Sequence, residues 1–104
     1  YTEAIGLLSD VAAKEKDPNT IGNCYYWMGE SYYGLGKYDD AVKSFEKVLQ
    51  VKSSAKSDDA LAMIGETYSR QGNTAEAKKA YQKLIAQFPQ SDNIPKAKKR
   101  LQQL

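Results

Sequence analysis

Two glutamates at matching positions are the residues of this chain that most resemble catalytic machinery. Glu30 and Glu66 lie 36 residues apart, and paired carboxylates are the acid and base of glycoside hydrolysis. If they lie on neighbouring helices, roughly 10 Å separates them, whereas a retaining pair requires about 5 to 5.5 Å and an inverting pair about 6.5 to 9.5 Å. We therefore interpret both as solvated or partner-binding carboxylates, which would favour a basic or amide-rich ligand.

The chain contains no histidine and a single cysteine, Cys24. The missing imidazole removes the commonest general base and every Ser–His or Cys–His nucleophile pair. It also removes the usual ligand sets for zinc, haem and non-haem iron. No Lys or Arg adjoins Cys24 in the sequence, so we expect a packing thiol. The sequence thus predicts a protein that is not an enzyme and has no metal site and no cofactor.

The composition indicates one folded domain. The 104 residues carry 15 basic and 13 acidic side chains, and 41% are apolar, which is too apolar and too near neutrality for intrinsic disorder. No apolar run approaches the roughly 20 residues needed to cross a bilayer, so direct membrane insertion is not expected. The chain opens inside a helical pattern without an initiator Met, and we expect a piece of a longer protein with any signal sequence upstream.

An internal repeat determines the predicted fold. A shift of 36 residues superposes Gly29-Glu30-Ser31-Tyr32 on Gly65-Glu66-Thr67-Tyr68, and a shift of 37 places Tyr1 on Tyr38. Apolar residues recur at three and four positions, which is the spacing of amphipathic helices. Gly36 and Gly72 follow such runs, where helices end, and Asn73 with Glu76 has the spacing of a capping box.

The pattern predicts about six helices, over residues 1–15, 20–35, 38–52, 57–71, 74–88 and 92–103. The units are then 1–17, the second helix of a truncated repeat; 18–53 and 54–90, two full repeats; and 91–104, a C-terminal capping helix. The small residues that should let paired helices approach are Gly29, Ala41, Gly65 and Ala77. We expect Phe45 and Tyr81 to lie where the space between the helices widens again.

These residues resemble the tetratricopeptide repeat. The first full repeat fills its pattern with Tyr25, Met28, Gly29, Tyr32, Gly36, Tyr38, Ala41 and Phe45. The second fills it with Leu61, Ile64, Gly65, Tyr68, Gly72, Ala77, Tyr81 and Pro89. The period exceeds the usual 34 or so, and Ser53 replaces the closing Pro of the first full repeat. The resemblance implies an all-α, right-handed α-solenoid of stacked helical hairpins.

A narrower resemblance, shared in part by other bacterial repeat proteins, is to the C-terminal repeat domain of the YbgF family. It rests on the segments 26–33, 88–91 and 96–101. That family is periplasmic and associated with the Tol-Pal system. The resemblance implies a helical segment of the Tol energy-transducing protein as the partner and a role in envelope upkeep during cell division. A cytoplasmic location is the alternative.

In such a solenoid the first helix of each hairpin lines the concave wall. Taking Tyr25, Met28 and Tyr32 as core-facing, the helical turn predicts the partner-binding groove. Its residues are Asn23, Tyr26, Trp27, Glu30, Tyr33, Asp59, Met63, Glu66, Ser69 and Arg70. Tyr and Trp are frequent binding anchors. Trp27 has a second interpretation, as a core residue packed near Leu8 and Val11.

The last helix is basic, with Lys96, Lys98, Lys99 and Arg100. Because the rest of the chain sums to about −1 and has no basic stripe, we expect a solvated face on a capping helix and no nucleic-acid partner. Ala97, Leu101 and Leu104 have the spacing of a helix that covers the end of the stack.

The predicted function is a non-enzymatic protein–protein interaction module that binds a peptide or helix of a partner in its groove. The alternative is self-association or a structural spacer role in a larger protein, because an array cut at Tyr1 would expose an apolar edge to another copy, giving a homo-oligomer.

Overall fold

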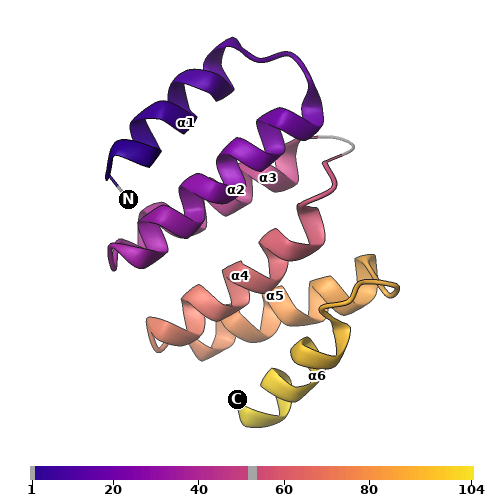
Figure 1. The fold of residues 1–104 in the computed structure, drawn as a ribbon. Helices are drawn as coiled ribbons and strands as arrows, with labels where there is room; N and C mark the ends of the chain where they lie inside the picture. Colours follow the sequence, from indigo (N-terminus) through magenta and orange to yellow (C-terminus); the bar gives the residue numbers. More distant parts are fainter. Residues whose placement is uncertain (1, 52–53) are drawn as a thin grey trace.

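The computed structural model describes residues 2–51 and 54–104, and in this part of the chain it consists of helices and their connections. The helices are α1 (Thr2–Lys14), α2 (Pro18–Gly34), α3 (Tyr38–Gln50), α4 (Ser57–Arg70), α5 (Thr74–Gln87) and α6 (Ile94–Gln103). Each packs against its neighbour in sequence, and α2 also contacts α4. Figure 1 shows α2 with α3 and α4 with α5 as stacked hairpins, with α1 and α6 at opposite ends.

The predicted fold class, an all-α solenoid of helical hairpins, is confirmed. Every helix begins and ends within a few residues of its predicted bounds. The predicted helical start at Tyr1, the predicted helix end at Lys52 and the replacement of the closing Pro by Ser53 lie outside the described residues.

The helix ends have local causes. Asp17 caps α2, since its carboxylate accepts a hydrogen bond of 3.1 Å from the backbone N–H of Thr20. Gly36 and Gly72 have φ values of 76° and 77°, a backbone conformation that ends the first helix of each hairpin. Glycine is suited to both positions because this conformation strains residues that carry a Cβ.

Half of the predicted capping box is present at α5. The Asn73 side chain accepts a hydrogen bond of 3.4 Å from the Glu76 backbone N–H. The reciprocal bond does not form, because the backbone N–H of Asn73 donates instead to the carbonyl of Tyr68 at 2.9 Å. The glycine turn therefore supplies the bond that Glu76 would have made.

Each hairpin is closed by an aromatic ring packed on a glycine. A Cβ built on Gly29 would lie 2.5 Å from a ring carbon of Phe45, and one on Gly65 would lie 2.7 Å from the ring of Tyr81. The expectation that these rings fill a wider space away from the glycines is therefore wrong. The glycines are needed because a fully buried ring occupies the volume that a side chain would take.

The α6 helix covers the end of the stack. Ala97 is buried, and Leu101 and Leu104 pack with it against a cluster that includes Leu84 and Tyr81. These contacts shield apolar side chains at the last hairpin from solvent, as a capping helix does. Within the described ranges, no helix has both the length and the apolar character needed to cross a bilayer.

Candidate functional site

The first helices of the two hairpins and the capping helix form one wall of the molecule, which we call the α2–α4–α6 wall. Helix α2 contacts α4, and Glu66 of α4 reaches Lys96 and Arg100 of α6. Figure 1 shows α2 and α4 in front of α3 and α5, with α6 below them. All ten predicted groove residues lie on α2 and α4.

Two aromatic side chains dominate the α2 part of the wall. The rings of Tyr26 and Trp27 meet edge to face, with centroids 5.3 Å apart and planes at 82°. Trp27 is 50% exposed, so the interpretation of Trp27 as a core residue beside Leu8 and Val11 is wrong. Tyr26 is partly buried, and its ring also packs on Phe45 at 5.6 Å, which ties it to the hydrophobic core.

Lys56, which the sequence analysis did not single out, lies over both rings. Its Nζ is 5.2 Å from the centroid of Tyr26 and 5.6 Å from that of Trp27, within the range of a cation–π interaction. The same ammonium is 3.9 Å from a carboxylate oxygen of Asp59. Lys56 and Asp59 are three residues apart at a helix start, and this spacing could have predicted the ion pair. No neighbouring residue in the sequence indicates that Lys56 contacts the two rings.

Asp58 and Asp59 are held by the link between α5 and α6. The amide of Asn93 donates a hydrogen bond of 2.8 Å to Asp59, and the hydroxyl of Ser91 donates one of 2.6 Å to Asp58. Both contacts span about one repeat, 33 or 34 residues. Because stacked repeats place residues one period apart side by side, this spacing could have predicted them.

The two glutamates differ in the structure although the repeat makes them equivalent. The side chain of Glu66 is 16% exposed and lies 3.3 Å from the ammonium of Lys96 and 3.1 Å from the guanidinium of Arg100. The expectation that Glu66 is free to bind a basic ligand is therefore wrong. The side chains of Lys96 and Arg100 are 46% and 41% exposed, as expected for a solvated face, and both cations also pair with Glu66.

Glu30 lies in a partly buried environment beside Tyr26. Burial raises the pKa of the Glu30 carboxyl, while a hydrogen bond with the Tyr26 side chain and the charge of Lys96 lower it. Burial also raises the pKa of Tyr26, and the charges of Glu30 and Asp59 raise it further. Carboxylates thus act on the aromatic part of the wall, beside the Lys56 ammonium that lies over its rings.

The remaining predicted groove residues divide between the surface and the core. Tyr33 packs on Tyr38 with ring centroids 5.5 Å apart, and the guanidinium of Arg70 lies 5.9 Å from the Tyr33 ring. Asn23 is exposed, whereas Met63 is partly buried and packs against the first core cluster.

Ser69 lies in a buried polar group behind the wall. Its Oγ, the Tyr81 hydroxyl and Arg100 Nε are buried and, among the described residues, have no hydrogen-bond partner. Ser69 is therefore part of the support between α4, α5 and α6 and not an open groove residue. Cys24 is buried too, and burial together with Glu15 raises the pKa of its thiol, as expected for a packing residue.

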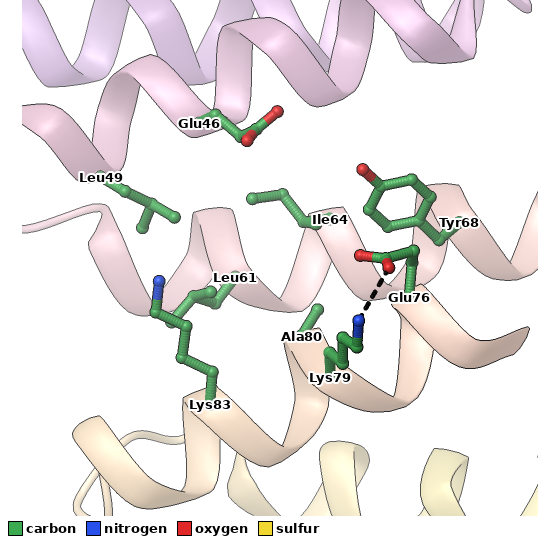
Figure 2. Close-up of a pocket in the computed structure, with 9 residues that line it drawn as sticks. All are labelled: Glu46, Leu49, Leu61, Ile64, Tyr68, Glu76, Lys79, Ala80 and Lys83. Atoms are coloured by element: carbon green, nitrogen blue, oxygen red, sulfur yellow. Dashed lines mark hydrogen bonds and ion pairs between the residues drawn. The ribbon is translucent and has the colours of Figure 1, made fainter. Parts of the chain in front are cut away.

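A second concavity lies between α3 and α5, away from the predicted groove. Figure 2 shows an apolar floor of Leu49, Leu61, Ile64 and Ala80 beneath a charged rim of Glu46, Glu76, Lys79 and Lys83, with Tyr68 at one side. Its volume is about 160 Å³, below the roughly 300 to 1,000 Å³ of typical ligand pockets. Glu76 and Lys79 already pair at 3.2 Å. We therefore take the α2–α4–α6 wall as the candidate site.

The arrangement on the wall suits binding. Among residues 2–51 and 54–104, no three Cys, Asp or Glu side chains are placed to hold a metal ion. Exposed rings beside charged groups can instead bury against a partner's side chains and orient them.

A comparison with known proteins establishes the family. Residues 20–90 match the family model described as tetratricopeptide repeat. The chain belongs to the tetratricopeptide repeat family. It is also similar to response regulator aspartate phosphatase A of Bacillus subtilis (strain 168), with 31% identity over 78 residues. That match covers 72% of this chain and 21% of the relative, so the chain spans about a fifth of the relative's length.

Tetratricopeptide repeat domains are generally interaction modules without enzymatic activity, and they typically bind protein partners. The matched range begins at Thr20 and ends at Gln90, so it contains both hairpins except for the first two residues of α2. In this tetratricopeptide repeat chain the α6 helix, which lies beyond the matched range, supplies the cations that neutralise Glu66.

Proposed function

We propose that this tetratricopeptide repeat domain binds a segment of another protein along the α2–α4–α6 wall and catalyses no reaction. The observation that carries the proposal is the half-exposed Trp27, which lies beside Tyr26 on this wall. A tryptophan offers about 150 to 250 Å² of contact surface, and such residues supply much of the binding energy at protein interfaces.

The charges of the wall favour a partner segment with basic side chains at one end and acidic side chains at the other. Glu30 and Asp59 accompany the rings on the α2 side. On the α6 side, Lys96, Lys99 and Arg100 border a hollow of about 440 Å³. A partner that places apolar and basic side chains toward α2 and acidic side chains toward α6 would complement both ends.

The resemblance of segments 26–33, 88–91 and 96–101 to the YbgF family supports a specific partner, a helical segment of the Tol energy-transducing protein. With it comes a periplasmic location and a role in envelope upkeep during division. The likeness to a phosphatase that, by its name, acts on response regulators supports contact with other proteins and is compatible with the cytoplasmic alternative.

Titration calorimetry with the helical segment of the Tol protein tests this proposal. Replacing Trp27 by Ala should weaken binding at least tenfold, because an interface anchor contributes about 2 kcal/mol or more. Val11→Ala is the matched control, since Val11 is 45% exposed on α1, outside the wall. No binding to the wild-type domain would refute the Tol partner, and equal binding by the Trp27 variant would refute the wall.

Self-association remains the second candidate, and an observation favours it. Leu7 and Val11 of α1 are 69% and 45% exposed, and α1 lies at the opposite end of the stack from α6 (Figure 1). A second copy could cover these side chains. Sedimentation of the wild type and of a Leu7→Lys variant distinguishes the two functions: a monomer in both cases refutes self-association.

A further inference from the structure

The Lys56 ammonium is bound as a ligand cation would be. Its Nζ lies 5.2 Å and 5.6 Å from the centroids of Tyr26 and Trp27 and 3.9 Å from Asp59. Two aromatic rings and a carboxylate around one ammonium are the elements with which proteins recognise cationic side chains. We call this group, Tyr26, Trp27 and Asp59, the cation cage.

The cage is held in place by contacts that do not involve Lys56. The Tyr26 ring packs on the fully buried Phe45, and Trp27 packs on Tyr26. The Asp59 carboxylate accepts a hydrogen bond of 2.8 Å from Asn93. The walls of the cage should therefore persist when the ammonium leaves, so the site is preorganised for another cation.

The ion pair between Lys56 and Asp59 is long. The side chain of Lys56 is 31% exposed, and its distance of 3.9 Å from Asp59 is at the limit of an ion pair. Holding a long side chain in one geometry costs conformational entropy, and exposed ion pairs contribute little. Lys56 immediately precedes α4, so only its backbone takes part in the helix start. Displacing the ammonium would therefore leave the backbone hydrogen bond at the start of α4 in place.

The local charge favours a replacement cation. Glu30, Asp59 and Asp58 each raise the pKa of Tyr26 through their negative charge, and the charge of Lys96 lowers the pKa of Glu30. Without the Lys56 ammonium, three carboxylates would face one ammonium. The negative potential of this region then attracts a positively charged group from solution or from a partner.

We propose that the cation cage receives a Lys or Arg side chain of the partner, and that Lys56 occupies the cage until the partner displaces it. This inference rests on the proposed function, because it names the chemistry that the wall recognises. Lys56 then acts as an internal competitor, which lowers the affinity for every cationic ligand by the same factor.

The experiment uses tetramethylammonium chloride as the probe, with sodium chloride at equal concentration as the reference. Trp27 is the single tryptophan, so its indole N–H gives one unambiguous NMR signal. Lys56→Ala should bind the probe about tenfold more tightly than the wild type, the change expected when two cation–π contacts and a weak ion pair no longer compete. Lys56→Arg, which keeps a cation in the cage, is the matched control and should bind as the wild type does. Asp59→Asn should weaken binding.

Two outcomes would overturn the cation cage. One is equal affinity of the wild type and Lys56→Ala for the probe, with circular dichroism showing an intact fold. The other is equal binding of tert-butyl alcohol, a neutral molecule of similar size, which would mean that the rings select apolar groups and not cations. Either result leaves the proposed function standing if Trp27→Ala still weakens the Tol segment, so the two failures are distinguishable.

Discussion

Replacing Gly29 by Ala would place a methyl group against the ring of Phe45. The new Cβ would lie 2.5 Å from one ring carbon and 2.7 Å from two others, distances that require the ring or a helix to move. Phe45 is fully buried, so the ring has no empty space to enter. Overpacking of this kind costs about 1 to 3 kcal/mol, and a clash this close belongs at the upper end.

Helix propensity offsets part of the cost, because Ala is favoured over Gly in a helix interior by about 1 kcal/mol. The net expectation for Gly29→Ala is a loss of about 2 kcal/mol. Gly6 provides the matched control, since it also lies inside a helix but has no atom within 4 Å of a built Cβ. Gly6→Ala should stabilise the domain by about 0.5 to 1 kcal/mol.

Urea unfolding followed by circular dichroism measures both changes. The two substitutions are chemically identical, so opposite signs would isolate the effect of the ring. Gly65→Ala should behave like Gly29→Ala, because its Cβ would lie 2.7 Å from the Tyr81 ring. If Gly29→Ala were as stable as Gly6→Ala, the account of the hairpin as a ring packed on a glycine would be refuted.

Two further substitutions test the packing between α4, α5 and α6. Tyr81→Phe should leave stability at pH 7 unchanged or raise it by up to about 1 kcal/mol, since the buried hydroxyl has no partner among the described residues and Phe45 fills the equivalent position. Burial raises the pKa of Tyr81 to about 12 from 10.0, so between these pH values the native state keeps a proton that the unfolded state loses. The free energy of unfolding of the wild type should therefore fall between about pH 10 and 12. This part of the fall should be missing in the Tyr81→Phe variant. A large loss at pH 7 in urea unfolding would contradict this. Glu66→Gln should cost about 1 kcal/mol and speed hydrogen exchange in α6, because Lys96 and Arg100 lose their carboxylate; unchanged exchange would show that the ion pairs do not hold the helix.

Contacts between residues one repeat apart could have been predicted from the sequence, but only by using the way in which the repeats stack. The contacts Asn93–Asp59 and Arg100–Glu66 each span 34 residues, close to the observed period. The side-chain amide of Gln71 donates to Asp39 across 32 residues in the same way. The period itself predicts that such residues are neighbours, although it does not say which atoms meet.

The sequence by itself determined the helices, their order and their ends. Gly36 and Gly72 end helices because a glycine by itself adopts a positive φ without strain. Asp17 caps α2 through a hydrogen bond to a residue only three positions away. These features depend on neighbours along the chain, so spacing alone predicts them.

Only the tertiary structure decided what each wall residue does. Glu30 and Glu66 are equivalent in the repeat, but α6 packs beside α4 and neutralises only Glu66 directly. Trp27 is exposed and Lys56 covers its ring because of how α4 begins beside α2. The physical reason is that the free energy of a side chain at the wall depends on charges and rings brought together by helix packing, and no local spacing records that packing.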